Sequence, residues 1–268
     1  MQNAARGSAG KRGSGPVQSL DRGLDLLERL AAAPGGLSLT ELGRAAGLAP
    51  STAHRLLRSL ATRRFARQDP ETGRWTVGVT AFAVGSAFTA GRDWLSTARA
   101  AMRDLVERAG ETANLAVADG PEAVYLSQVE CDQPMRAFAR PGSRVPLHCS
   151  AVGKALVAAR PAAERRRWAA GGGFARITAK TLTDPPAVAA DLEGTRRRGF
   201  AVDDEEHAVG LRCVAAPVFD AEGRAVAALS LSGPAARISD ARLETLGRLV
   251  QEAAAAVTTE IGGVPPTA

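Results

Sequence analysis

The chain has 268 residues and 45% apolar side chains, enough for one large or two ordinary domains with buried cores. No run approaches 18 apolar residues and the first residues are polar and glycine-rich, so we expect neither a membrane span nor a secretory signal, and a cytoplasmic location. The formal net charge of +6 lies in residues 1–78, which is typical of a nucleic-acid contact, although a solvated basic surface would also explain it.

The front of the chain first predicts two helices. Residues 19–32 carry apolar side chains at helical spacing, with Ser19 placed to cap the helix. Residues 38–47 begin with a capping box, in which the Ser38 side chain and the Glu41 side chain each satisfy a backbone N–H group of the other residue. A second short helix is therefore expected, ending at a glycine.

A third predicted helix over residues 51–61 has a polar outward face. Its apolar side chains fall on one side at 100° per residue, and hydroxyls and arginines fall on the other. Two helices joined by a tight turn, the second presenting such a face, are typical of a helix-turn-helix whose second helix enters the major groove. The residues of this helix that we predict to contact DNA are Ser51, Thr52, His54, Arg55, Arg58 and Ser59.

Residues 65–78 predict two short strands around a turn that contains proline and glycine. Such a basic hairpin is a wing, so an ordinary helical hairpin is disfavoured and a winged helix-turn-helix is expected. We predict that Arg55 reaches a base edge and that Arg67 and Arg74 contact phosphates. Ser19 and Arg22 of the first helix complete the predicted DNA-binding set.

The remaining elements alternate in a way that predicts an α+β domain with an antiparallel sheet, because neighbouring strands are joined by turns of two to four residues. Helices are expected over 79–108, 151–159, 161–170, 187–198 and 239–260, and strands over 112–119, 123–130, 135–140, 212–219 and 224–232.

The stretch VPLHCSAVGKALVA, residues 145–158, at first suggests chemistry. Adjacent side chains diverge, so His148 is poorly placed to act as a base for Cys149. A P-loop would need glycine at position 148 and a hydroxyl residue at 155, and the chain has neither. What remains is a helix N-terminus whose free N–H groups, at Ser150 to Gly153, are able to hold an anion.

Three runs resemble the IclR family of bacterial transcriptional regulators: RPGSRVPLHCSAVGKALVA, GFAVDDEEHAVGLRCVAAPVFDAEGRAVAALSLSGP, and the front end VQSLDRGLDLLERL, STAHRLLRSL and GRWTVG. The similarity covers residues 16–262. It implies a GAF-like effector-binding domain behind the winged helix-turn-helix, a homodimer or dimer of dimers, and a small, usually carboxylate-bearing metabolite as ligand. Members usually carry a glycine between the recognition helix and the wing, where this chain has Arg63-Arg64-Phe65.

The resemblance also implies an effector pocket. Its positions in this chain are Ser150, Ala151, Val152, Gly153, Asp203, Cys213, Ser230 and Ser232. Ser230 and Ser232 are two apart in a strand and so share a face, which suits a small organic acid; the alternative is that the cysteine is a small core residue and that the serines are solvated. The acidic run 203–206 is expected to be a solvated loop rather than a metal site.

Three other functions compete with ligand-gated DNA binding. An enzyme would use Cys149 or Cys213 with His148 or His207, but no enzyme needs a winged helix-turn-helix. A redox-responsive regulator would act through Cys213, and a chromosome-binding protein would use the basic front end without sequence preference. We expect no enzyme activity, no metal and no cofactor; His54 and His207 lack partners at ligand spacing, and the three cysteines lack CxxC spacing.

The expected organisation is a flexible basic tail (1–15), the winged helix-turn-helix domain (16–78), a linker helix (79–92), the effector-binding domain (93–262) and a short tail (263–268).

Overall fold

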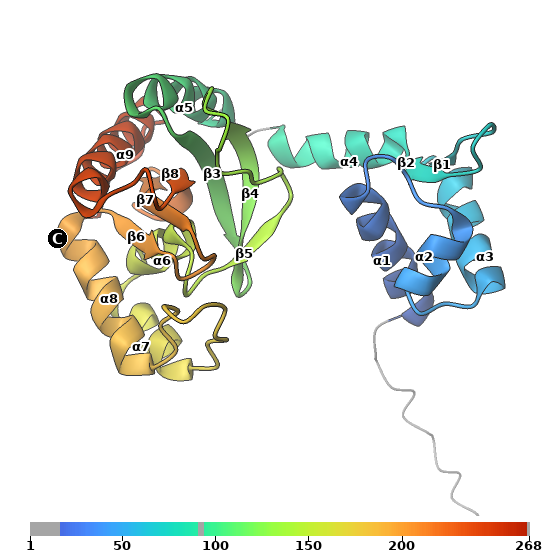
Figure 1. Ribbon diagram of the computed structural model, residues 1–268, viewed down its shortest axis with the longest axis horizontal. Helices are drawn as coiled ribbons and strands as arrows, with labels where there is room; N and C mark the ends of the chain where they lie inside the picture. Colours follow the sequence, from blue (N-terminus) through green and yellow to red (C-terminus); the bar gives the residue numbers. More distant parts are fainter. Residues whose placement is uncertain (1–16, 91–93, 267–268) are drawn as a thin grey trace, which may run out of the picture. The chain divides into compact units, whose positions relative to one another are not determined.

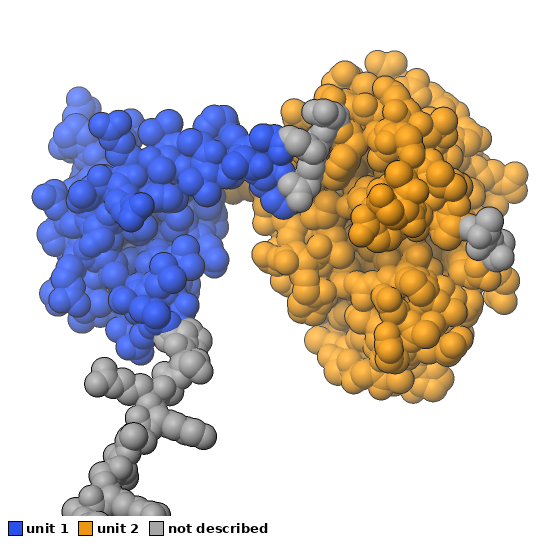
Figure 2. All heavy atoms as spheres, turned by 180° about the vertical axis from the view of Figure 1, so that it is seen from behind, with its two compact units in different colours: residues 1–92 blue, residues 93–268 orange. Residues whose placement is uncertain are grey.

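The computed structural model describes residues 17–90 and 94–266, and the predicted tail 1–15 lies outside them. The chain divides into two compact units, residues 1–92 and 93–268 (Figures 1 and 2). No helix in the described ranges is long and apolar enough to cross a membrane.

The first unit is a winged helix-turn-helix, as the sequence predicts (Figure 1). Three helices are followed by a two-stranded antiparallel hairpin, the wing, and a further helix. The elements are α1 (Gln18–Ala32), α2 (Leu39–Ala45), α3 (Pro50–Thr62), β1 (Ala66–Gln68), β2 (Trp75–Val77) and α4 (Val79–Thr89).

Of the two helix caps predicted in this unit, one is present and one is not. The capping box is confirmed: Ser38 Oγ accepts from the Glu41 N–H at 3.2 Å, and Glu41 Oε2 accepts from the Ser38 N–H at 2.7 Å. The predicted cap of α1 is wrong, because Val17 precedes the helix without a side-chain cap and Ser19 lies inside the first turn. Leu26, Leu42, Leu57 and Trp75 bring the three helices and the wing into one core.

The second unit is α+β, as predicted. Its sheet has strand order β5-β4-β3-β8-β7-β6, and every neighbouring pair is antiparallel. The elements are α5 (Trp94–Ala109), β3 (Thr112–Asp119), β4 (Glu122–Val129), β5 (Arg144–Pro146), α6 (Ala151–Ala158), α7 (Ala162–Gly171), α8 (Pro185–Arg198), β6 (Ala201–Asp204), β7 (Leu211–Phe219), β8 (Ala225–Pro234) and α9 (Asp240–Glu260).

Helices cover both faces of this sheet (Figure 1). In β8, Leu229 and Leu231 pack with α5 and α9, whereas Ala228 packs with α6 and α8 on the opposite face. Since side chains alternate along a strand, Ser230 and Ser232 lie on the α6 face. The two hydroxyls are therefore placed on the side of the sheet where α6 begins.

Two sequence-based expectations about this sheet are wrong. Residues 135–140 form no strand, and their two largest apolar side chains, Met135 and Phe138, are 71% and 62% exposed. Among the residues that the structure describes, β5 alone pairs with the outer edge of β4. Strand β6 was not anticipated, and its last two residues, Asp203 and Asp204, belong to the acidic run that we expected to be a solvated loop.

Candidate functional sites

The polar face of α3 is open to solvent. Ala53 and Leu57 are fully buried and hold the helix against the core. Of the predicted contact residues, Ser51, His54, Arg55, Arg58 and Ser59 are exposed and Thr52 is half-buried. The geometry therefore leaves this row of hydroxyl, imidazole and guanidinium groups available to a partner.

The arginines of the wing have different surroundings. Arg67 is exposed on β1, as expected for a phosphate contact. The Arg74 guanidinium instead donates to the carbonyls of Gly35 and Gly36, at 2.9 Å for the shortest contact, and pairs with Glu41 at 3.2 Å. These contacts hold the wing against the loop before α2, and the phosphate contact of Arg74 stays a prediction. Ser19 and Arg22 lie exposed at the start of α1.

In the second unit, a cavity of about 480 Å³ lies on the α6 face of the sheet. This volume is within the range of small-molecule sites. Seven of the eight effector positions expected from sequence line it, namely Ser150, Ala151, Val152, Asp203, Cys213, Ser230 and Ser232.

Strand register brings the distant residues of this set together. Asp203 on β6 is opposite Cys213 on β7, and Cys213 is opposite Ser232 on β8. In the next row, Ser230 on β8 is opposite Asn114 on β3. Paired positions in an antiparallel sheet lie within about 5.5 Å between Cα atoms, so four strands contribute to one small polar area.

Several hydrogen-bonding groups in the cavity are without partners. Ser230 Oγ is buried and has none in the described chain. The N–H groups of Ala151 and Val152, in the first turn of α6, make no backbone hydrogen bond there. Ser232 Oγ accepts from Asn114 Nδ2 at 3.3 Å, and Asn114 in turn accepts from Gln128 at 2.9 Å. The cavity thus offers both N–H donors and hydroxyl groups to a ligand.

Gly153, the eighth position, has another role. Its N–H donates to Ser150 Oγ at 3.2 Å, so it is not a free donor, and it does not line the cavity. A Cβ atom here would lie 2.4 Å from Leu147 Cα. The glycine therefore permits α6 to pack directly on the backbone that precedes it.

The lysine after Gly153 belongs to a buried ion-pair cluster. Lys154 is 2% exposed and pairs with Asp191 at 2.9 Å and with Glu206. Burial alone would lower the pKa of Lys154, but the two carboxylates outweigh it and hold that pKa above its usual value. This cluster corrects our expectation for the acidic run, because Glu206 and Asp203 are buried.

Asp203 differs from Glu206 in that no cationic side chain of the described residues forms an ion pair with it. Its Oδ1 accepts from the N–H groups of Glu206 at 2.8 Å and His207 at 3.3 Å. Burial outweighs these hydrogen bonds and raises the pKa of Asp203 to about 7. The cavity therefore contains a carboxyl group whose charge changes near neutral pH.

The cysteines and His148 have surroundings unsuited to nucleophilic chemistry. His148 Nε2 lies 2.9 Å from the Ala175 carbonyl, and its ring stacks on Phe174. Burial raises the pKa of Cys149 to about 12 and also raises that of Cys213, so both thiols stay protonated. This gives no support to a thiolate enzyme or a thiolate redox sensor. Within the described residues, no three metal-binding side chains cluster.

Sequence reasoning missed several cavity residues. Asn114, Tyr125 and His207 line it, and so do Phe138 and Arg140 from the loop between β4 and β5. Asn114 was the one with a local signal, being a polar residue in the otherwise apolar run NLAVA. The others were not recognisable, since their place at the cavity depends on strand pairing and on the path of a loop.

Comparison with known proteins covers both units. The bacterial transcriptional regulator IclR C-terminal model matches residues 87–259, and the IclR helix-turn-helix domain model matches residues 19–70. The transcriptional regulator BhcR of Paracoccus denitrificans is 46% identical over 248 residues, or 92% of this chain and 88% of that protein. The transcriptional repressor IclR of Escherichia coli is 44% identical over 253 residues, or 94% and 92% of the two chains.

A solved structure shares the fold. An IclR homologue from Microbacterium hydrocarbonoxydans, complexed with 4-hydroxybenzoate, has a TM-score of 0.78 at 24% identity, covering 91% of this chain and 98% of that one. The matching families consist of transcriptional regulators, which are not enzymes. With both of its units matched, the chain belongs to the IclR family of bacterial transcriptional regulators.

Proposed function

We propose that α3 and the wing bind operator DNA and that a small organic acid in the cavity of the second unit modulates this binding. The proposal of a ligand rests on one observation. Seven expected effector positions line a single cavity, and the Ser230 hydroxyl in that cavity has no hydrogen-bond partner among the described residues. An effector that binds one conformation of the protein more tightly shifts the population that is competent to bind DNA. Both release and recruitment of DNA are compatible with this mechanism.

An acid suits the cavity better than an apolar ligand. The free N–H groups of Ala151 and Val152 are at a helix N-terminus, where the helix dipole favours a negative charge. Arg140 also lines the cavity and is exposed to solvent, so it brings positive charge to its edge. Ser230 is then available to a second polar group of the ligand.

For the DNA half, we propose that Arg55 contacts a base edge in the major groove and that Arg67 contacts the backbone. Both side chains are exposed. The other predicted residues of α3 and Ser19 and Arg22 of α1 would complete the contact surface. Two copies of the chain, held as a homodimer or dimer of dimers in the cytoplasm, would read half-sites separated by one helical turn or a multiple of it.

The test uses acetate, pyruvate and 4-hydroxybenzoate as probes, with a duplex that the wild-type chain selects from a random pool. An acid present at about 100 times its dissociation constant should stabilise the protein by about 2.7 kcal/mol and change its affinity for the duplex. Replacing both Ser230 and Ser232 by alanine should weaken acid binding by about 1 to 3 kcal/mol and leave ligand-free DNA binding intact. Unchanged acid affinity in this variant, measured by calorimetry, would place the ligand elsewhere.

A further inference from the structure

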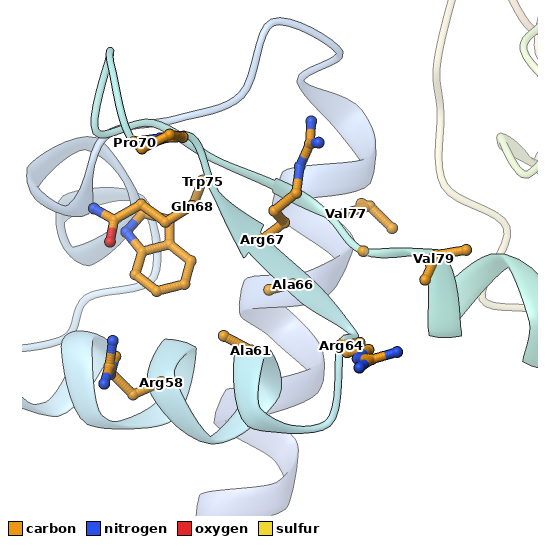
Figure 3. A pocket seen from close by; sticks show the side chains of 11 residues that line it. Arg58, Ala61, Arg64, Ala66, Arg67, Gln68, Pro70, Trp75, Val77 and Val79 are labelled. Atoms are coloured by element: carbon orange, nitrogen blue, oxygen red, sulfur yellow. The ribbon is translucent and has the colours of Figure 1, made fainter.

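A groove of about 670 Å³ lies between α3 and the wing (Figure 3). Its charged lining residues are three arginines: Arg58 from α3, Arg64 from the turn after α3, and Arg67 from β1. Apart from Gln68, the other residues that line it are apolar, and among the described residues no acidic side chain does so. Figure 3 shows Arg58 and Arg64 at opposite ends of the groove, below the strand that carries Arg67.

The protein compensates the charge of the three arginines only in part: the Asp69 carboxylate interacts electrostatically with Arg67 but forms no ion pair with it. Elsewhere in the same unit, Arg29 pairs with Asp25 at 2.9 Å and Arg74 pairs with Glu41 at 3.2 Å. In residues 17–90, by contrast, no ion pair involves an arginine of the groove. A groove whose lining carries charge of one sign attracts a polyanion.

Arg64 is held in a backbone conformation that favours glycine. Its φ is 60°, and it ends α3 in a Schellman arrangement: its N–H donates to the Ala61 carbonyl, and the Phe65 N–H donates to the Leu60 carbonyl, both at 2.9 Å. An ordinary side chain at this position costs free energy that glycine would avoid. A strained residue of this kind points to a use for its side chain.

We propose that this groove holds one strand of the DNA backbone and that Arg64 contacts a phosphate there. The proposal rests on the DNA binding proposed above and adds a residue that the sequence pattern did not assign. The guanidinium group matches the oxygens of a phosphate in a bidentate arrangement. The arginines come from separate elements along the groove rather than converging on one point, which fits successive phosphates of a strand better than a single free anion.

The experiment measures binding of the full chain to a random-sequence duplex by fluorescence anisotropy over a salt series. The logarithm of the affinity falls as the logarithm of the salt concentration rises, and in Arg64→Gly this fall should be less steep by about 0.9. The same variant should bind roughly tenfold more weakly at low salt. Its midpoint of thermal unfolding should not fall, because glycine relaxes the backbone. Arg64→Lys, which keeps the charge, should keep the slope. Arg63→Ala is the matched control, since Arg63 is exposed and adjacent but does not line the groove.

If Arg64→Gly weakens DNA binding without lowering the midpoint of thermal unfolding, the loss of binding comes from a lost DNA contact and not from a destabilised fold. An unchanged slope in Arg64→Gly would overturn the proposal, and so would an equal loss of slope in Arg63→Ala, which would assign the effect to general surface charge. If the wild-type chain bound no duplex, the proposed DNA-binding function would fail as well. Normal wild-type binding with an unaffected Arg64→Gly variant would remove only this site.

Discussion

At the scale of single residues, two lysines contact the acidic run 203–206 in opposite environments. Lys154 is 2% exposed and pairs with Glu206 and Asp191. Lys180 has a 47% exposed side chain and pairs with the two middle acids of the run at 3.1 and 2.7 Å. The two lysines therefore form a matched pair for measuring what burial does to an ion pair.

We expect Lys154→Met to lower the free energy of unfolding by about 3 to 5 kcal/mol, because it leaves Glu206 buried without a counter-ion. Lys180→Met should leave the free energy of unfolding close to the wild-type value, since water screens that pair. Urea denaturation at neutral pH measures both. Equal losses in the two variants would contradict the assignment of a structural role to the buried cluster.

Asp203 makes the stability of the second unit depend on pH. Its pKa is raised to about 7 by burial, so the folded state binds the proton more tightly than the unfolded state. Its stabilising contribution is complete below about pH 4 and is lost as the pH rises through 7. The unfolding free energy of Asp203→Asn minus that of the wild type should therefore rise by up to about 4 kcal/mol from pH 4 to pH 8, because only the wild type loses the contribution of Asp203.

Several charged or titratable groups surround Asp203. Lys154 lowers its pKa and Glu206 raises it, while Cys213 faces it from the neighbouring strand. Denaturation of both proteins at closely spaced pH values isolates the contribution of Asp203, because the other groups are common to both. A difference between variant and wild type that did not change with pH would show that Asp203 keeps an ordinary pKa.

At the scale of elements, the position of α6 determines where its free N–H groups lie in the cavity. Ser150 caps the start of the helix: its hydroxyl accepts from the Gly153 N–H and donates to the Pro146 carbonyl at 2.6 Å. Gly153 lets the helix approach Leu147, since a Cβ atom would lie 2.4 Å from the Leu147 Cα atom. The local cap and this close approach together set where the free N–H groups of the helix lie.

Gly153→Ala should lower the free energy of unfolding by about 2 to 3 kcal/mol, because the helix must move away from Leu147. Gly171→Ala, at the end of α7, is the control: a Cβ atom there meets open space, so this variant should be neutral or more stable by about 0.4 to 1 kcal/mol. Chemical denaturation compares them. Full stability in Gly153→Ala would mean that the close approach is not required.

At the scale of the whole molecule, the first unit leaves large apolar side chains uncovered. Leu20 and Leu24 on α1 are 60% and 48% exposed, and Val79, Phe82 and Val84 on α4 are 67%, 76% and 58% exposed. Several large exposed apolar side chains on one helix, as on α4, are typical of a protein–protein contact. A second copy of the chain is the occupant that we propose, since two helix-turn-helix units are needed to read two half-sites.

Phe82→Glu should halve the number of subunits in the oligomer, from tetramer to dimer or from dimer to monomer. The reason is that association would bury the glutamate carboxylate away from water, which is unfavourable. Val209→Glu is the control, because Val209 is 82% exposed but lies in the second unit. Sedimentation of the two variants and the wild type gives the masses. An unchanged mass for Phe82→Glu would exclude this surface from the interface.

The amino-acid sequence by itself determined the features that depend on neighbours along the chain. The helices over 19–32 and 51–61, the Ser38 capping box and the wing follow from hydrophobic period, capping and turn residues, which act within a few positions. The resemblance of residues 140–158 and 199–234 to a known family then indicated which residues line a cavity, and those positions remain our proposal for the effector site.

Only the tertiary structure decided which polar groups are buried and what they contact. Lys154 meets Glu206 across 52 positions, and Arg74 meets Gly36 across 38, so no local pattern reports either contact. The exposed loop at 135–140 alternates like a strand but finds no partner, and a strand exists only where its backbone groups are paired. Desolvation and backbone pairing depend on segments far away in the chain, and these come together only on folding.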